Sequence, residues 1–494
     1  MVDAIPDPET DLGGDLHAVI DTNDATTTVE LVASSDIRIP YFGWFFHPLI
    51  ARDLRRRVRH AATSLEAAVV GAEQPAPFRT SRILPPAAYT PEQIGLVATV
   101  CALTALANFG GALFGQYGAP VAESFDASDA QLGVGLAITR VGVLVALFSA
   151  ALSDRRGRRR LVLISFSGVA IANGLSALAP SFSLFVAPQV LTRALATATL
   201  MVAGIAVIEQ APERARAYSL ALLALAAGAG FAIAIALLPL ADVATDAWRL
   251  PFLISASTIL LVRPLARTLT ETTRYRALEE RHAERGRIGE VFDRVYRFRF
   301  LALALAAFLT NVFSAPAAQL TNRYLIEERD FTNTTIALFR GVTNGLPGLV
   351  GILLAGYLAE RRGRRPLAVV ALIVGTMFQM GVFLGEGPFI WVASTVAIVA
   401  AACAGLAIGT YNGELFATEV RGTSNALLLV CGVSGAVTGL LLATNLESLV
   451  DSIGSLGAAI AVCGIAPLVA AILVLPWLPE TKDTNLDDVS PSEV

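Results

Sequence analysis

A stretch reading ALSDRRGRRR occupies residues 151–160 of the chain, and a similar string, LAERRGRRPL, returns at 358–367. In each string an apolar run ends at a carboxylate, and arginines then flank a single glycine. Arginine-rich connections mark the cytoplasmic side of membrane proteins, because such clusters are costly to move through hydrocarbon. Both strings therefore predict a short cytoplasmic turn between two membrane helices, with the glycine free to adopt a positive φ.

The composition is that of a membrane protein. Of the 494 residues, 54% are hydrophobic and 16% are charged, whereas soluble proteins carry about 25% charged residues. The apolar residues form blocks of about 20, the length of a helix that crosses the hydrocarbon core. We expect twelve transmembrane helices, over residues 93–117, 130–152, 161–179, 183–208, 217–240, 250–269, 299–321, 334–357, 367–385, 389–413, 424–446 and 455–477.

The distribution of arginine predicts the orientation of these helices. The connections after the second, fourth, sixth, eighth and tenth spans are rich in arginine, and the others hold few. The positive-inside rule then places both termini in the cytoplasm. We expect a multi-pass protein of the cytoplasmic (plasma) membrane.

The segments outside the spans differ in character. Residues 1–40 are acidic and polar, which predicts disorder. Residues 45–70 predict an amphipathic, arginine-rich helix that either lies on an anionic leaflet or packs as a solvated helix on the cytoplasmic side. The expected division is a cytoplasmic extension (1–92), a six-helix bundle (93–269), a cytoplasmic linker (270–298), a second six-helix bundle (299–477) and a cytoplasmic tail (478–494).

Three landmarks recur in the same order at nearly one spacing. The arginine-rich string is the first, and EQAPERARA after the fourth span matches ELFATEVRG after the tenth, which aligns Glu209 with Glu414 and Arg216 with Arg421. The third is LTETTRY after the sixth span, which matches LPETKDT after the twelfth. These matches indicate a duplicated six-helix unit, and parallel repeats of this kind place a substrate site between the halves near mid-membrane.

These motifs resemble those of the major facilitator superfamily. The string at 151–160 is similar to its D-R-x-G-R-R signature, and the strings after the fourth, tenth and twelfth spans are similar to those of its sugar-porter and general metabolite-transporter branch. The resemblance covers roughly residues 90–485. It implies an all-α membrane fold of twelve transmembrane helices in two pseudo-symmetric six-helix bundles.

The chain departs from the family's patterns at three places. The first span has no carboxylate, which argues against proton symport of a sugar. Ala417 replaces the proline expected after Glu414, and the fifth span lacks the G-P-x-x-G-G string of drug antiporters.

The resemblance also implies a network that holds the cytoplasmic face closed while the outer face is open. Partly exposed ion pairs contribute only about 0–1 kcal/mol each, which suits contacts that break in every cycle. Plain anchoring of the topology is the alternative. The expected members of this cytoplasmic latch are Asp154, Gly157, Arg158, Glu209, Arg216, Glu360, Gly363, Arg364, Glu414 and Arg421.

Three of the arginines inside predicted spans are candidates for the transport pathway, because a charge near the bilayer centre costs at least ~2.5 kcal/mol. We expect Arg140 to bind substrate. Arg193 resembles the superfamily's span-four arginine, often linked to proton coupling, and Arg193 and Arg340 are the coupling candidates. The alternative for each arginine is a structural ion pair or a hydrogen bond to backbone carbonyls.

Neutral polar side chains within the spans are further candidates for substrate binding. Each either contacts substrate or forms an interhelical hydrogen bond. They are Asn108, Gln116, Asn311, Gln319, Asn344 and Asn412.

These features predict a secondary active transporter that works by alternating access. The abundance of arginine and scarcity of acids in the spans favour a small anionic or carboxylate-bearing organic solute. The alternatives are a neutral sugar or polyol porter, a drug or metabolite exporter, and a non-transporting receptor on the same fold.

We do not expect an enzyme. GVSG at 432–435 matches the G-x-S-G of rhomboid serine proteases, but all four histidines lie outside the spans, so the serine has no base. No P-loop string is present for ATP-driven transport. We expect no cofactor, no metal site and no nucleic-acid partner. The expected partners are the small-molecule substrate and the lipid bilayer, with a coupling proton left open, and the expected functional unit is a monomer.

Overall fold

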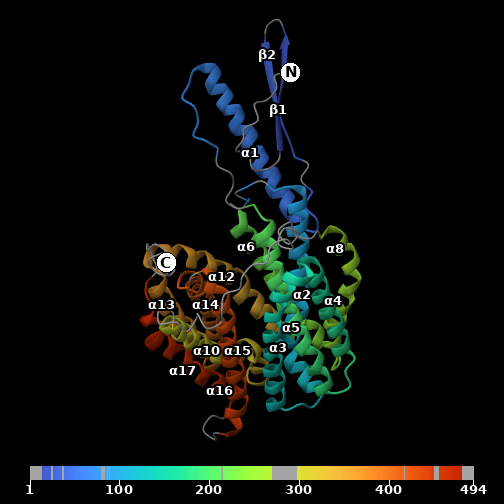
Figure 1. The fold of residues 1–494 in the computed structure, drawn as a ribbon, viewed down its shortest axis with the longest axis vertical. Helices are drawn as coiled ribbons and strands as arrows, with labels where there is room; N and C mark the ends of the chain where they lie inside the picture. Colours follow the sequence, from blue (N-terminus) through green and yellow to red (C-terminus); the bar gives the residue numbers. More distant parts are fainter. Residues whose placement is uncertain are drawn as a thin grey trace.

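The computed structural model describes residues 14–23, 26–35, 38–78, 84–85, 87, 89–212, 215–269, 297–416, 418–449 and 455–480. At 14–23, 26–28, 33–35, 145–156, 217, 349, 356, 360, 410–414, 418–423 and 447–449 it describes the backbone alone. Long helices form a bundle, and a two-stranded sheet and one further helix project from one end of it (Figure 1).

The N-terminal half of the bundle starts at a well-capped helix. Thr90 and Gln93 each accept a hydrogen bond from the other's backbone N–H, and Pro91 fills the first helical position, where no N–H is needed. The elements of this half are α2 (Pro91–Ser124), α3 (Asp129–Arg156), α4 (Arg158–Ala177), α5 (Phe182–Gln210), α6 (Arg216–Ala236) with its 3₁₀ extension η2 (Leu238–Asp242), and the consecutive α7 (Arg249–Ser257), η3 (Thr258–Leu261) and α8 (Val262–Thr268).

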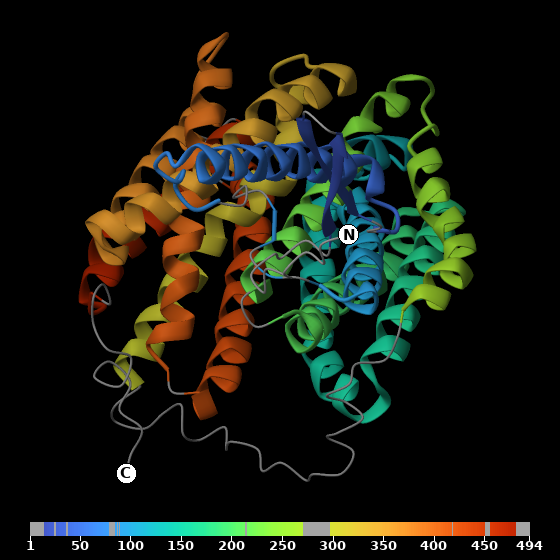
Figure 2. The ribbon, with the colours of Figure 1, turned by 90° about the horizontal axis from the view of Figure 1, so that it is seen from above.

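The C-terminal half repeats this order of long helices. Its elements are α10 (Arg297–Gln319), the short α11 (Thr321–Glu327), α12 (Asn333–Arg362), α13 (Arg364–Leu384), α14 (Phe389–Glu414), α15 (Thr418–Leu449), and the consecutive α16 (Leu456–Cys463), α17 (Ile465–Val469), η5 (Ala470–Val474) and η6 (Leu475–Trp477). Figure 2 shows the two halves side by side, the first in blue to green and the second in yellow to red.

The predicted fold class is confirmed. Eleven helical segments among the described residues are long and apolar enough to cross a membrane. The remaining predicted span coincides with α3, which runs into the stretch where only the backbone is described. All twelve predicted spans therefore lie on helices.

One contact repeats between the halves and reflects their duplication. In the first half the Arg159 guanidinium donates to the carbonyl of Leu269 at 2.7 Å, which ties α4 to the end of α8. In the second half the guanidinium of Arg365 donates to the carbonyl of Leu478 at 3.3 Å, which ties α13 to the end of the last span. Equivalent arginines thus close the sixth helix of each half against the third.

The N-terminal extension contains more regular structure than its composition predicts. We expected disorder over residues 1–40, but β1 (Gly14–Asn23) and β2 (Thr26–Ser35) form an antiparallel hairpin in which Asn23 pairs with Thr26. Both strands are rich in β-branched residues, which favour an extended backbone in spite of the acidic composition. The part of this prediction that covers residues 1–13 lies outside the described residues.

The helix α1 (Gly43–Val70) follows the hairpin and projects obliquely from the bundle, passing over both halves (Figures 1 and 2). Two of its arginines form ion pairs with the buried carboxylate of Asp53. Its Oδ1 lies 3.3 Å from a terminal guanidinium nitrogen of Arg56, and its Oδ2 lies 3.5 Å from Nε of Arg57. Tyr41 hydrogen-bonds Thr268 at 3.2 Å and so joins the base of α1 to the end of α8. The expected linker is described only at its last two residues, Arg297 and Phe298, and the expected tail only over 478–480.

The two ends of the bundle differ in how the halves meet. We call the end with the turns at Gly157 and Gly363 the basic face, and the end with Asp129 and Asn333 the opposite face. Hydrogen bonds and an ion pair join the halves toward the opposite face, where Asp242 contacts Asn333 and Asp129 contacts Arg323. Below these contacts a cavity lies between the halves.

Candidate functional site

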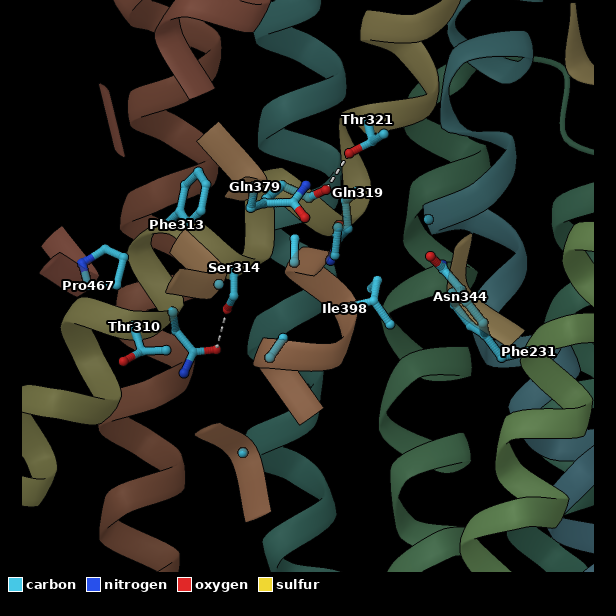
Figure 3. Close-up of a pocket in the computed structure, with 18 of the residues that line it drawn as sticks. Phe231, Thr310, Phe313, Ser314, Gln319, Thr321, Asn344, Gln379, Ile398 and Pro467 are labelled. Atoms are coloured by element: carbon cyan, nitrogen blue, oxygen red, sulfur yellow. Dashed lines mark hydrogen bonds between the residues drawn. The ribbon is translucent and has the colours of Figure 1, made fainter. Parts of the chain in front are cut away.

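A cavity of about 760 Å³ lies between the two halves and is lined by both. Helices α2, α3, α5 and α6 supply one wall, and α10, α12, α13 and α14 supply most of the other. Figure 3 shows part of the lining, with Thr310, Gln319, Gln379 and Ile398 placed around the central space. The position between duplicated halves is the one that the repeat predicts.

Arg140 and Gln319 meet across this cavity. Arg140 projects from α3 of the first half and Gln319 from the end of α10 of the second. With the amide oxygen of Gln319 turned toward the guanidinium, Nε of Arg140 donates to it at 2.6 Å and one terminal nitrogen also donates. A neutral amide satisfies donors of Arg140 but leaves its charge unbalanced.

Arg193 lies near Arg140 on the same side of the cavity. It projects from α5, and its charge is close enough to repel that of Arg140. Its Nε is buried and has no hydrogen-bond partner among the described residues. Because a buried donor without a partner is costly, this nitrogen indicates a position where a ligand or water completes the site.

Arg340 differs from the other two arginines because it is engaged by protein groups. Its Nε donates to Oδ1 of Asn322 at 2.7 Å, and Nδ2 of Asn322 donates to the backbone carbonyl of Gln116 at 2.7 Å. Arg340 is 7% exposed and Asn322 is 2% exposed. These hydrogen bonds join α12, α11 and α2 and so connect the two halves. Arg340 therefore fits the alternative that its role is a structural hydrogen bond within the protein.

No carboxylate lines the cavity among the residues that the structure describes. Three arginines do, and none of them faces an acid there. The cavity wall is therefore cationic, although the chain as a whole carries a formal charge of −4.

The neutral polar candidates mostly line the cavity but also bond within the protein. Asn108 donates to the carbonyl of Ala227 at 2.6 Å, which ties α2 to α6, and Asn311 donates to Ala307 one turn earlier at 2.9 Å. Asn344 accepts from the hydroxyl of Thr343 at 3.2 Å. Each has capacity left for a solute. The side chain of Asn412 lies outside the described residues.

Sequence reasoning missed several polar residues of this region. Asn322 was not predicted, because it lies just past the expected end of a span. Gln189 was missed although it precedes Arg193 by one helical turn and so shares its face of α5. Gln189 donates to Asn173 at 3.0 Å and to Ser176 at 2.8 Å, which binds α5 to α4 behind the cavity. Its spacing from Arg193 is the signal that could have found it.

Two predicted members of the cytoplasmic latch form an ion pair with each other. Arg158 donates to Glu209 at 2.9 Å, and both side chains are buried, at 4% and 8% exposed. Because both lie in the first half, this pair joins α4 to α5 and is not a contact between halves. Arg158 and Glu209 are thus buried where partly exposed pairs were expected, and their part in a cytoplasmic latch stays a prediction. Arg216 is exposed at the start of α6.

The glycines of the repeated string adopt the conformation that the sequence predicts. Gly157 has φ +85° and Gly363 has φ +92°. In the second half, the carboxylate of Glu480 accepts from the backbone N–H of Arg364 at 2.9 Å and of Arg365 at 3.0 Å. Glu480 thus caps the N-terminus of α13, where the helix dipole favours a negative charge. The side chains of Asp154, Glu360, Glu414 and Arg421 lie outside the described residues.

No group of metal-binding side chains was found among the described residues, and the four cysteines are unpaired within the protein. The cavity offers amides, hydroxyls and guanidiniums, which suit an organic solute better than a cation.

The sequence matches the family model described as Major Facilitator Superfamily over residues 95–413, with a second match over 330–491. The chain belongs to the major facilitator superfamily. No curated protein sequence matches it.

Several solved structures of superfamily transporters share this fold. The xylose transporter XylE from E. coli in an inward-open conformation has a TM-score of 0.63 and 17% sequence identity, covering 80% of this chain and 98% of that one. A bacterial homologue of the human lysosomal transporter Spinster, inward-facing and occupied, has a TM-score of 0.58 and 16% identity, with 78% and 96% covered. The nucleoside transporter NupG has a TM-score of 0.61 and 11% identity, with 76% and 98% covered. The chain thus shares its fold with a xylose transporter, a Spinster homologue and a nucleoside transporter.

Proposed function

We propose that this protein is a secondary active transporter that moves a small organic anion, such as a carboxylate, across the cytoplasmic membrane by alternating access. The observation that supports an anion is the cationic cavity. Arg140 and Arg193 line it together without a carboxylate among the described lining residues, and Nε of Arg193 is buried without a partner. A guanidinium remains protonated in proteins. An anionic solute would balance this charge, and the planar fork of arginine would orient a carboxylate.

We further propose that the basic face is cytoplasmic, as the positive-inside rule predicts. The contacts that join the halves then lie on the outer side, and the conformation is inward-facing. The N-terminal extension and the tail would both lie in the cytoplasm. Cysteine labelling tests this orientation. A cysteine introduced in 270–298 should react only from the cytoplasm and one in 322–333 only from outside, and the reverse pattern would overturn the proposed orientation.

A neutral sugar or polyol is the second candidate. Its support is the set of amide side chains on the cavity wall, among them Gln319 and Gln379 (Figure 3). Amides are suited to sugar hydroxyls because each offers both donors and an acceptor. The two candidates differ in whether binding requires a negative charge on the solute.

Substitution of Arg140 distinguishes these candidates. A hydrogen bond to a charged group contributes about 1.5–3 kcal/mol, so Arg140→Ala should weaken binding of a carboxylate by at least roughly tenfold. Arg140→Lys should restore only part of the affinity, because an ammonium lacks the fork. Binding would be followed by ligand-dependent thermal stabilisation of the purified protein, with carboxylates and sugars tested in parallel. If Arg140→Ala binds carboxylates as tightly as the parent, the neutral solute becomes the better proposal.

A further inference from the structure

The first-half wall of the cavity differs in chemistry from the part of the other wall that α13 and α14 form. The wall of the first half carries Arg140 and Arg193 beside the amides of Asn108 and Gln189. The wall formed by α13 and α14 is mainly apolar, with Leu372, Ile398 and Ile408 among its residues. A solute that fills the space between them would therefore meet arginines on the first half and mainly apolar side chains on α13 and α14.

Glycines on α14 leave open space next to the apolar wall. A Cβ added at Gly405 or Gly409 would meet no other atom within 4 Å, and both residues lie in the interior of a helix. A helical glycine costs roughly 1 kcal/mol relative to alanine. At Gly351 of α12, by contrast, an added Cβ would lie 2.8 Å from Ala402, so close packing of helices explains that glycine. Packing does not explain Gly405 and Gly409.

We infer that the substrate is an amphipathic organic anion, with its carboxylate between Arg140 and Arg193 and an apolar alkyl or aryl body against the wall of α13 and α14 beside Gly405. This inference rests on the proposed transport of an organic anion and specifies its class. The buried Nε of Arg193, which has no partner among the described residues, supplies the position for the charged end. The open space beside Gly405 supplies the position for the apolar end.

Contact with the apolar wall of α13 and α14 should strengthen the binding of the substrate. Each buried methylene strengthens binding by about fourfold, the factor that corresponds to its transfer free energy. A solute with a phenyl ring and a short linker should therefore bind far more tightly than a small hydroxy acid. A hydrophilic acid of the same charge would leave the apolar wall in contact with water and gain nothing from it.

Three probes separate the charge of the solute from its apolar body. 3-Phenylpropionate carries both, 3-phenylpropionamide keeps the body without the charge, and lactate keeps the charge without the body. Binding would be measured as thermal stabilisation of the purified full-length protein. The parent should bind 3-phenylpropionate at least about tenfold more tightly than either other probe, since one end of the site is empty with each of them.

The variant Gly405→Leu tests the position of the apolar body. Its side chain would occupy the open space, so affinity for 3-phenylpropionate should fall by about tenfold or more while affinity for lactate stays within about twofold. Gly341→Leu is the matched control. Gly341 lies on α12 outside the cavity lining, is exposed, and also has no atom within 4 Å of an added Cβ. It should bind both acids as the parent does, and size-exclusion chromatography would confirm that both variants are folded.

The outcomes distinguish the inference from the function on which it rests. If neither acid stabilises the parent, or if the amide binds as well as its acid, transport of an organic anion is wrong and the inference fails with it. If lactate binds as tightly as 3-phenylpropionate, or if Gly405→Leu weakens both acids equally, the anion proposal stands and the amphipathic substrate is overturned.

Discussion

The carboxylate of Asp242 caps the N-terminus of α12 from the other half of the molecule, with Oδ2 accepting from the backbone N–H of Thr334 at 2.9 Å and from its hydroxyl at 2.8 Å. Its Oδ1 accepts from the backbone N–H of Asn333 at 3.1 Å and from its side chain at 2.7 Å. A helix N-terminus has unsatisfied N–H groups and favours a negative charge. Since Asp242 belongs to the first half and α12 to the second, these four bonds join the halves at the opposite face, and the proposed alternating access requires them to break when that face opens.

Asp242→Ala should therefore shift the protein toward the conformation that is open at the opposite face. Loss of a capping side chain costs about 0.5–2 kcal/mol, so the ratio of the two conformations should change by roughly two- to thirtyfold. Electron–electron distance measurements between spin labels at the exposed positions 134 and 442 would follow this shift. Asp246→Ala is the control, because Asp246 bonds to Ser124 and Arg249 within the first half. Equal effects of the two variants would argue against the cap as a closing contact.

The buried pair Arg158–Glu209 should stabilise the first half and not act as a contact that breaks in each cycle. Removing one member leaves a buried charge, which costs about 3–5 kcal/mol. Arg158→Ala should therefore lower the thermal unfolding temperature strongly, and adding Glu209→Ala should recover part of the loss. Thermal unfolding of both single variants and the double variant gives the coupling energy. Strictly additive losses would show that the two side chains do not support each other.

Glu480 and Gly363 should depend on each other. Glu480→Ala removes the acceptor for two backbone N–H groups and should cost about 0.5–2 kcal/mol. Gly363→Ala should also be destabilising, because its φ is +92° and the new Cβ would lie 2.8 Å from a carboxylate oxygen of Glu480. In a Glu480→Ala background the close contact between the new Cβ and the carboxylate is absent, so Gly363→Ala should destabilise the protein less there. Glu386→Ala, an exposed change beyond the other end of α13, should alter unfolding little.

The acid cluster on the opposite face predicts a pH dependence of stability. Burial raises the pKa of Glu327 in spite of its ion pair with Arg323, and the negative charges of Asp129 and Glu328 add to the rise. The folded protein then holds this proton more tightly than the unfolded chain does, so Glu327 stabilises the fold below its ordinary pKa and loses that contribution as pH rises through the raised value. The unfolding temperature of the parent, relative to Glu327→Gln, should fall as pH rises across this window. A difference that grows with pH would contradict the raised pKa.

Much of the fold could be predicted because the bilayer restricts it. Every backbone group in hydrocarbon must find its partner within a helix or closed barrel, so apolar blocks of about 20 residues were sufficient to place twelve helices. The role of the repeated glycine could also be predicted, since the turns at Gly157 and Gly363 need a positive φ. The strands over residues 14–23 and 26–35 were not predicted, because the acidic composition was given more weight than the β-branched residues.

The candidate site was predictable in part. The sequence identified Arg140, Arg193 and Arg340 as candidates, because a charge within a span is costly unless it is paired or contacts a ligand. It did not separate Arg193, with its buried nitrogen, from Arg340, which Asn322 satisfies. It also named Arg158 and Glu209 together as latch members but expected partly exposed pairs, whereas the structure buries these two side chains against each other.

The sequence alone determined the membrane class, the helices and the duplication, because these depend on composition and on strings read along the chain. Only the tertiary structure decided which polar side chains face the cavity and which bind neighbouring helices. Helices such as α14 are apolar on nearly all sides, and lipid is as apolar as the interior of the bundle, so no hydrophobic stripe fixes the rotation of each helix about its axis. That rotation follows from packing among all the helices, which brings Gln319 to Arg140 and Asn322 to Arg340.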